Sequence, residues 1–207
     1  MEVFDVSGSV HESALLSAER ALATGELVVV PTDTVYGVAA RPDVAGSTAR
    51  LFGAKRRSRR LTLPVLASGL AAAERVAVFD RRARTLATRF WPGGMTLVLP
   101  RTKAATTWDL GHEADTVGVR VPAHPVALAL LQRTGPLAVT SANVSGEPTP
   151  SDCPGVRAAL GDAVAVYLCA GRCAGTPSTV VDLTGTEVRV IRAGAVRDAD
   201  IRAALGS

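Results

Sequence analysis

Short apolar runs alternate with helical segments along this chain, and this alternation restricts its fold more than any other feature. The first helical segment opens with a capping box of Ser9 and Glu12 and ends at Gly25. The apolar run 27–30 follows and stops at Pro31, which is typical of a buried strand. Further strands are expected at 63–67, 96–99, 117–121, 137–140, 164–168, 179–183 and 188–192, and further helices at 43–54, 70–75, 80–90, 124–133, 156–160 and 199–205.

Strands interleaved with helices predict an α/β fold in which helices flank a twisted sheet. The gap 184–187 between the last two strands is short enough for an antiparallel hairpin, so we expect a mixed sheet. Asp43 is expected to cap the second helix, whose C-terminal end then carries a basic segment. No linker or shift in composition divides the 207 residues, and we therefore expect a single domain over residues 1–207.

The positive charge is concentrated in one short segment. The chain has 23 Lys and Arg against 19 Asp and Glu, and five of the cations lie in residues 55–60. Without them, 18 cations would face 19 anions, which indicates a local anion site rather than a broadly basic surface. In an extended segment, Lys55 and Arg57 would point the same way and could grip a polyphosphate. A solvated charged loop or an RNA-facing patch is the alternative.

Several protein classes are excluded by missing signatures. No apolar run approaches the length of a membrane span and no secretory signal is visible, so we expect a cytoplasmic protein without membrane association. The three cysteines and three histidines lack the spacing of a zinc framework, so we expect no metal held by protein side chains. P-loop, G-x-G-x-x-G and G-x-S-x-G patterns are also absent, which argues against common nucleotide-binding folds and serine hydrolases.

Polar side chains gather where the expected strands end. Directly after the run 27–30 comes the segment PTDTVYG, with two hydroxyls, a carboxylate and a phenol. Ser141 and Asn143 alternate after the run 137–140, so both side chains could face one ligand. Open α/β sheets bind ligands at such strand ends, although each segment alone is more typical of a turn that satisfies its own backbone. Other polar residues at strand ends are Arg120, Ser178 and Arg192.

Seven short motifs occur in a distinctive order: PTDTVYG at 31–37, K-x-R at 55–57, FWPGG at 90–94, TVGVRVP at 116–122, HPVA at 124–127, SANVSG at 141–146 and STVVDL at 178–183. In this order they resemble the YrdC/TsaC/Sua5 family of threonylcarbamoyl-adenylate synthases, over about residues 27–194. The resemblance implies a single YrdC-like domain with a concave, positively charged site. It is to the short TsaC type, without the additional C-terminal domain of the Sua5 type.

The resemblance implies an enzyme that condenses L-threonine, bicarbonate or CO2, and ATP to threonylcarbamoyl-AMP and pyrophosphate, for N6-threonylcarbamoyladenosine formation in tRNA. Mg²⁺ would accompany ATP, and no bound organic cofactor is implied. The implied protein partners are tRNA-modifying transferases of the TsaD type, with contact to tRNA as a further expectation. The catalytic set would be Lys55, Arg57, Ser141 and Asn143; threonine would be held by Thr32, Thr34, Tyr36, Arg120 and Ser178; and ATP would be held by Lys55, Arg57, Arg59, Thr116, Asn143 and Arg192.

The chain also departs from the family pattern. Many relatives have Lys-Gly-Arg-Pro followed by Asn-Pro-Leu, some have a histidine near position 66, and the usual Arg-Pro-Gly is altered here. These departures concern substrate selectivity and loop geometry. Two alternative functions stay open, an O-carbamoylation module with the same fold and a non-catalytic RNA-binding or ribosome-maturation protein. The departing residues are Arg56, Ser58, Leu61, Thr62, Leu66 and Ala193.

Overall fold

The apolar runs form the strands of one sheet in the computed structural model, which describes residues 1–112, 115–173 and 175–206. Each expected strand is present, and two strands that the sequence did not indicate, β1 and β3, join them. The strands are β1 (Glu2–Asp5), β2 (Val28–Val30), β3 (Gly37–Ala40), β4 (Val65–Leu66), β5 (Met95–Pro100), β6 (Thr116–Arg120), β7 (Leu137–Ser141), β8 (Val166–Cys169), β9 (Thr179–Asp182) and β10 (Arg189–Arg192).

Each expected helix is present as well, with ends that shift by a few residues. None of the helices in the described ranges is long and apolar enough to cross a membrane. The helices are α1 (Glu12–Ala23), α2 (Ser47–Ala54), α3 (Leu70–Glu74), α4 (Arg81–Phe90), α5 (Pro125–Thr134), α6 (Cys153–Leu160) and α7 (Asp198–Leu205), with two 3-10 turns, η1 (Ala105–Thr107) and η2 (Gly161–Ala163).

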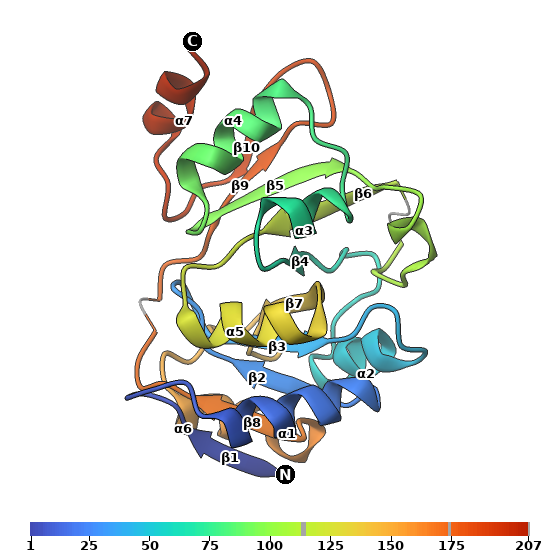
Figure 1. Ribbon diagram of the computed structural model, residues 1–207, viewed down its shortest axis with the longest axis vertical. Helices are drawn as coiled ribbons and strands as arrows, with labels where there is room; N and C mark the ends of the chain where they lie inside the picture. Colours follow the sequence, from blue (N-terminus) through green and yellow to red (C-terminus); the bar gives the residue numbers. More distant parts are fainter. Residues whose placement is uncertain (113–114, 174, 207) are drawn as a thin grey trace.

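The sheet runs along the molecule in the order β1-β8-β2-β3-β7-β4-β6-β5-β9-β10 (Figure 1). The sheet contains parallel pairs such as β1–β8 and β5–β9 as well as antiparallel pairs such as β3–β7 and β5–β6, so the predicted mixed sheet is confirmed. Strands β9 and β10 pair antiparallel, as the short gap between them predicted. The short strand β4 pairs with both β7 and β6 and thereby joins the two halves of the sheet.

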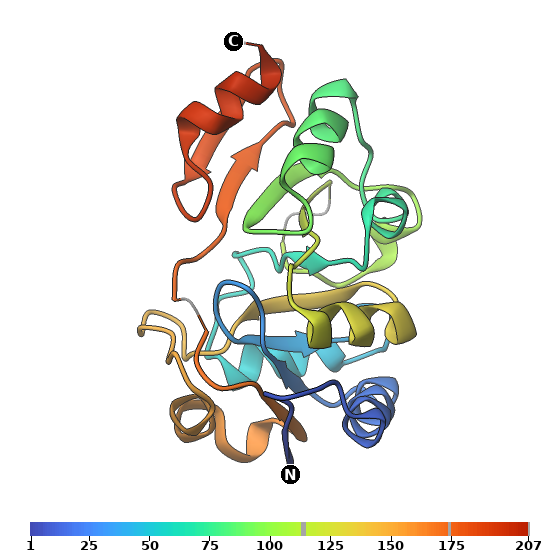
Figure 2. The same cartoon turned by 60° about the vertical axis from the view of Figure 1, so that its left-hand side comes forward.

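Burial on both faces explains the valine run of β2. Val28 and Val30 belong to the apolar cluster that includes residues of α1 and α5, whereas Val29 belongs to the cluster that includes residues of α2 and α6. Figure 2 shows α1 and α5 together on one side of the sheet. Because successive side chains of a strand point to opposite faces, a strand covered on both faces needs an apolar residue at every position.

Two helix starts differ from the prediction. Helix α1 begins after His11, which makes no side-chain cap bond, and the Ser9 hydroxyl lies 3.3 Å from His11 Nε2 instead of capping the helix. The predicted capping box is therefore wrong. Helix α2 begins after Gly46 and not at Asp43, because the Asp43 carboxylate pairs with the guanidinium of Arg41, at 2.7 and 2.5 Å.

Two of the three cysteines are joined, which the sequence spacing did not predict. Cys153 at the start of α6 forms a disulfide with Cys169 at the end of β8, and their Cα atoms lie 5.5 Å apart. The pairing depends on the packing of α6 against β8, which brings together two cysteines 16 positions apart. Cys173 keeps a free thiol, and burial raises the pKa of that thiol.

Candidate active site

A cavity of about 440 Å³ lies where the two halves of the sheet meet. Its wall includes side chains of β5, β6, β7 and β9 together with the segment between β2 and β3. The structure therefore brings together most of the site residues that the sequence and the resemblance predicted, namely Thr32, Thr34, Tyr36, Arg57, Thr116, Arg120, Ser141, Ser178 and Arg192. Lys55 and Asn143 lie behind this wall, and Arg59 lies outside the cavity.

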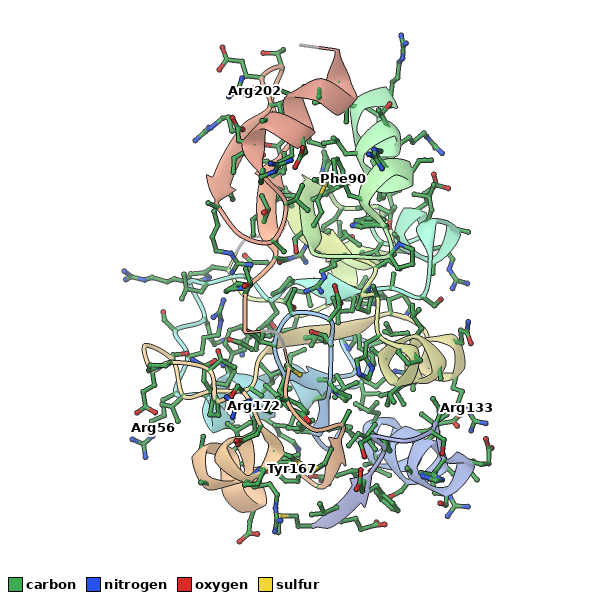
Figure 3. The ribbon with its side chains drawn as sticks, turned by 90° about the vertical axis from the view of Figure 1, so that its left-hand side faces the viewer. Arg56, Phe90, Arg133, Tyr167, Arg172 and Arg202 are labelled. Carbon is green, nitrogen blue, oxygen red and sulfur yellow. A yellow bond between two sulfur atoms is a disulfide. The ribbon has the colours of Figure 1, made fainter. Side chains whose placement is uncertain are left out.

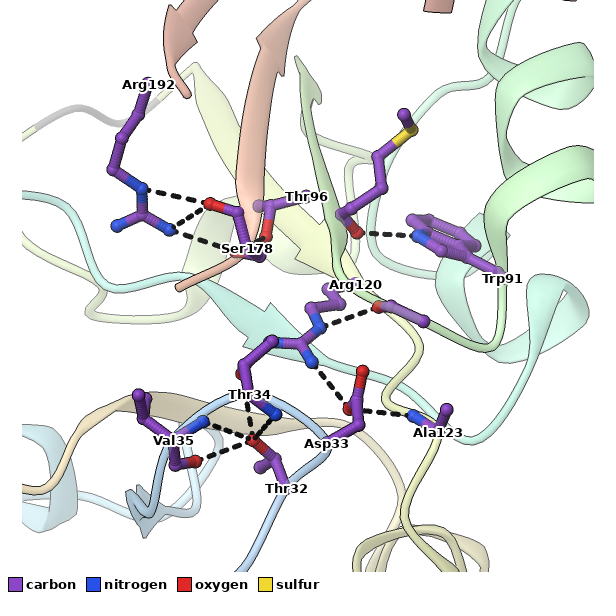
Figure 4. Close-up of polar contacts among 12 residues, drawn as sticks. Thr32, Asp33, Thr34, Val35, Trp91, Thr96, Arg120, Ala123, Ser178 and Arg192 are labelled. Carbon is purple, nitrogen blue, oxygen red and sulfur yellow. Dashed lines mark hydrogen bonds and ion pairs between the residues drawn. The ribbon is translucent and has the colours of Figure 1, made fainter. Parts of the chain in front are cut away.

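Arg120 is held rigidly at the end of β6 (Figure 4). Its Nε donates to the carbonyl of Gly93 at 2.9 Å, Nη1 donates to Thr34 Oγ1 at 2.8 Å, and Nη2 donates to Asp33 Oδ1 at 2.6 Å. A guanidinium has five N–H groups, so these three contacts leave one unused on each terminal nitrogen within the described part of the chain. Burial lowers the pKa of Arg120, and the adjacent Asp33 opposes that shift.

Asp33 is a site residue that the sequence reasoning did not assign. Its Oδ1 accepts a hydrogen bond from the backbone N–H of Ala123 at 2.9 Å as well as the bond from Arg120. The side chain is 19% exposed and the Arg120 side chain 8%, so the ion pair is largely shielded from water. Asp33 therefore ties the segment after β2 to the segment after β6 and fixes the arginine between them. Only its place between two predicted threonines hinted at this role.

The hydroxyls of Thr32 and Tyr36 are largely used within the protein. Thr32 Oγ1 accepts from the N–H groups of Thr34 and Val35, both at 3.2 Å, and donates to the carbonyl of Val35 at 2.6 Å, which is a turn held by its own side chain. The Tyr36 hydroxyl accepts from the N–H of Ala170 and donates to the carbonyl of Gly171, both at 2.8 Å. Both side chains line the cavity, and both also shape the backbone around it.

Lys55 is buried at the end of α2, with 1% of its surface exposed. Its Nζ donates to the carbonyl of Asn143 at 2.5 Å, to Asn143 Oδ1 at 3.1 Å, and to the carbonyl of Ser141. Ser141 Oγ donates to Asn143 Oδ1 at 2.5 Å, so the predicted catalytic lysine, serine and asparagine form one connected group. Burial, aided by the charge of Arg57, lowers the pKa of Lys55 to about 8, so the amine remains mostly protonated at neutral pH.

The sequence analysis considered an extended basic segment, and the structure shows that this segment is not extended. Lys55 closes α2 with helical backbone angles, and Arg56 adopts a left-handed conformation with φ 48°. Arg56 consequently projects into solvent at the edge of the molecule (Figure 3). Arg57 instead turns into the cavity wall, where burial lowers its pKa and Nη2 lies 3.4 Å from the carbonyl of Thr62.

Arg192 and Ser178 form a second polar group on the wall (Figure 4). Arg192 donates from Nε and Nη2 to the carbonyl of Ser178, at 3.1 and 2.8 Å, and from Nη2 to Ser178 Oγ at 2.9 Å. Ser178 Oγ also lies 2.8 Å from Thr96 Oγ1. These contacts hold the start of β9 and the end of β10 together, so two residues predicted from separate motifs act as one unit.

Arg59, unlike Arg57, does not line the cavity. Its Nη2 lies 2.5 Å from both carboxylate oxygens of Asp109, and its side chain is 48% exposed. The guanidinium also stacks over the ring of Phe52, with 4.9 Å between its central carbon and the ring centroid. Sequence reasoning could not separate Arg59 from Arg57, because the acidic partner lies on a distant loop.

The charge of the cavity favours anionic ligands. Its described wall carries three arginines, Arg57, Arg120 and Arg192, and no carboxylate, with Asp33 just behind Arg120. The hydroxyls of the wall add neutral donors, and donors of both kinds are suited to carboxylate and phosphate oxygens. The described residues hold no group of three or more His, Cys, Asp or Glu side chains that could bind a metal ion.

The fold and the site define an α/β protein with an arginine-lined cavity at the centre of a mixed sheet. A family model for Sua5, YciO and YrdC proteins, described as "Telomere recombination", matches residues 20–194. The chain therefore belongs to the Sua5/YciO/YrdC family, and the resemblance seen in its motifs is confirmed.

Individual relatives agree with this assignment. A Mycobacterium tuberculosis protein named "Putative threonylcarbamoyl-AMP synthase" is 43% identical over 99% of this chain and 95% of its own. The structure of Pyrococcus abyssi Sua5 complexed with L-threonine superposes with a TM-score of 0.91 at 31% identity, and the chain covers 61% of that longer protein. Escherichia coli YciO, at 24% identity, shares the fold with a TM-score of 0.85 over 95% of this chain and 96% of its own.

Proposed function

We propose that this protein is a threonylcarbamoyl-AMP synthase, which joins L-threonine, bicarbonate or CO2, and ATP and releases pyrophosphate. The observation that carries the proposal is the cavity wall with three arginines and no carboxylate in its described part, in a chain whose relatives bear this name. All three substrates present anionic oxygens during the reaction. A preorganised set of cations would stabilise them most where charge develops.

The reaction requires no covalent intermediate on the protein. The amine of threonine attacks CO2, loses a proton, and becomes a carbamate. A carbamate oxygen then attacks the α-phosphorus of ATP, and the bond from that phosphorus to the bridging oxygen breaks as pyrophosphate leaves. The protein's task in this scheme is to hold three anionic groups together and to offset their repulsion.

The Arg120 side of the cavity is suited to threonine. The two unused N–H groups of Arg120 could bind both oxygens of a carboxylate, and Thr34 and Ser178 line the same cavity. The P. abyssi Sua5 structure contains L-threonine, which supports a threonine site in this family. We therefore assign Thr32, Thr34, Arg120 and Ser178 to threonine, with Tyr36 as a residue that shapes the loop.

The opposite side is suited to ATP, bound as its magnesium complex. Arg57 is on the wall there and Lys55 lies directly behind it, in contact with Ser141 and Asn143. Thr116 lines the same cavity, and Arg192, which contacts Ser178 on the threonine side, is proposed as a further contact to ATP. The described residues contain no cluster of acidic side chains that could bind Mg²⁺, so the ion would be held by the phosphate oxygens of ATP.

Release of pyrophosphate from ATP tests the proposed function. We expect the rate to require both L-threonine and bicarbonate, since the carbamate is the group that attacks the phosphorus. The measurement compares complete mixtures with mixtures that lack one substrate. A rate that is unchanged when threonine is omitted would refute the proposal. Binding to RNA that weakens steeply with salt, without such turnover, would support the non-catalytic alternative.

The product, an activated acyl adenylate, suits a subsequent acyl transfer. We infer that it passes to transferase proteins that modify adenosine in tRNA, in the cytoplasm where tRNA is used. The mixed anhydride is the reactive group in that transfer, and AMP is the leaving group.

A further inference from the structure

Three buried polar side-chain atoms of the described residues lack any hydrogen-bond partner, and they lie on two neighbouring loops. They are Arg57 Nε, Thr62 Oγ1 and Ser145 Oγ. The loops are in contact through Lys55, whose carbonyl accepts from the N–H of Ser145 at 2.9 Å. Buried polar groups are normally paired, so unpaired atoms on two loops that touch call for a partner.

Two of the orphaned atoms belong to residues of the cavity wall. Arg57 and Thr62 both line the cavity, whereas Ser145 does not. The two residues are adjacent, since Arg57 Nη2 lies 3.4 Å from the carbonyl of Thr62. A guanidinium N–H can only donate and a hydroxyl can donate as well, so a single group with several acceptor oxygens would satisfy both.

The charge distribution selects between the two anionic substrates. Arg120 is paired with the carboxylate of Asp33, which offsets part of its charge. Among the described residues, Lys55 bonds only to oxygens of uncharged groups. Burial and, to a smaller extent, the nearby charge of Arg57 lower its pKa, so these two cations lie close together. No acidic partner of either cation is found among the described residues. Arg57 and Lys55 therefore place two cations without a described acidic partner at one end of the cavity, whereas at the other end Asp33 offsets one of the two cations, Arg120 and Arg192. This balance favours a polyphosphate at the Arg57 end.

We propose that Thr62 is an ATP-binding residue, whose hydroxyl donates a hydrogen bond to a phosphate oxygen of ATP beside the Nε–H of Arg57. The choice of ATP as the ligand rests on the proposed function. The hydroxyl is unsatisfied without that ligand and paired with it, so its contribution appears only on binding.

The substitution Thr62→Val tests this role because it removes the hydroxyl and keeps the branched shape. We expect the affinity for ATP, measured by calorimetric titration without threonine, to fall about tenfold. We expect the melting temperature of the free protein to stay unchanged or rise, because a buried unsatisfied hydroxyl has been replaced by a methyl group. Thr62→Ser keeps a hydroxyl at this position and should retain most of the ATP affinity.

Two comparisons sharpen the test. Thr134→Val removes a hydroxyl that donates to the carbonyl of Leu130 at 3.1 Å, far from the cavity, and should leave ATP affinity unchanged while lowering the melting temperature. Ser145→Ala removes the orphaned hydroxyl that lies off the wall and should raise the melting temperature or leave it unchanged. These opposite signs separate an unsatisfied hydroxyl from one that already holds the fold together.

The inference is overturned if Thr62→Val leaves ATP affinity unchanged, or if it lowers the melting temperature as Thr134→Val does. It is also overturned if the Michaelis constant for threonine rises and that for ATP does not. The readout is ATP binding, which does not depend on turnover. Failure of threonine-dependent pyrophosphate release in the wild-type protein would therefore refute the proposed function and leave this test in place.

Discussion

The geometry of Arg120, more than its charge, suits it to bind a carboxylate. Three acceptors in different directions hold the guanidinium, and two of its N–H groups have no partner among the described residues and remain for a ligand. A lysine carries the same charge on a flexible stem with one nitrogen. It cannot reach the carbonyl of Gly93, the hydroxyl of Thr34 and the carboxylate of Asp33 and still bind two further oxygens.

We therefore expect Arg120→Lys to raise the Michaelis constant for threonine by about tenfold or more, a loss of roughly 1.4 kcal/mol or more in binding. The Michaelis constant for ATP should change little, because Arg57 and Lys55 are untouched. Steady-state pyrophosphate release with each substrate varied in turn provides the measurement. Equal rises for both substrates would contradict the assignment of Arg120 to threonine.

For single residues, the sequence indicates which side chains belong to the site better than it indicates the partners that those side chains contact. The cations and hydroxyls at strand ends could be chosen only through the order of the motifs and the resemblance that it carries, and most of them line the cavity. The role of Asp33 could not be predicted, because its partners Arg120 and Ala123 are remote in the sequence. The resemblance implies an ATP contact for Arg59, and its ion pair with Asp109 could not be predicted, because nothing near Arg59 in the chain reveals that partner.

Among the helices, α5 begins at a titratable cap, His124, from which we expect a dependence of stability on pH. His124 precedes Pro125, and its Nδ1 accepts from the N–H of Val126 at 3.3 Å, which requires that nitrogen to be unprotonated. Burial lowers the pKa of His124, with a smaller opposing effect from Asp33. In the pH window below the unfolded value of about 6.5, the unfolded chain therefore binds more protons than the folded protein does, and stability falls as pH falls.

Replacement of His124 by asparagine should remove this dependence. Asparagine caps helices well and does not titrate. Between pH 7.5 and 5, the free energy of unfolding should therefore fall by about 0.5–1 kcal/mol less for His124→Asn than for the wild type. Urea unfolding at both pH values gives the comparison. The matched control is His11→Asn, because His11 makes no side-chain cap bond and its replacement should leave the wild-type dependence in place. Parallel pH profiles for His124→Asn and the wild type would contradict the capping role.

The elements that the sequence predicted share a strong apolar pattern, and those that it missed lack one. Strand β1 is mostly exposed, and its sequence EVFD contains no apolar run. Strand β3 has the sequence GVAA, whose small residues have weak strand preference. Gly37 is required there by packing, because a Cβ at this position would lie 2.6 Å from Cγ1 of Val139 on β7. This contact is visible only once β3 and β7 are paired.

For the whole molecule, the central feature is the join between the two halves of the sheet. Strand β4 contains only Val65 and Leu66, yet it pairs with β7 on one side and β6 on the other. The cavity lies across the same join, with Ser141 contributed from one half and Arg120 from the other. The order of the strands could not be predicted from the sequence, because neighbours such as β3 and β7 are separated by many residues.

The continuous sheet predicts that the protein unfolds as one unit. Differential scanning calorimetry should show a single transition with equal calorimetric and van't Hoff enthalpies, because neither half retains its full set of strand pairs alone. ATP should shift this whole transition to higher temperature, since it binds only the folded protein. Two resolved transitions, of which ATP moves one, would show that β4 does not couple the halves.

The position of the cavity residues along the chain also has a consequence for biosynthesis. The residues that line the cavity extend along the sequence from Thr32 to Arg192, with Arg57, Arg120 and Ser141 between them. A nascent chain that has emerged from the ribosome as far as Ser141 still lacks β8, which lies between β1 and β2, and the β9–β10 hairpin that carries Arg192. Translation must therefore pass Arg192 before the anion-binding wall is complete. We expect that shorter nascent chains do not bind ATP.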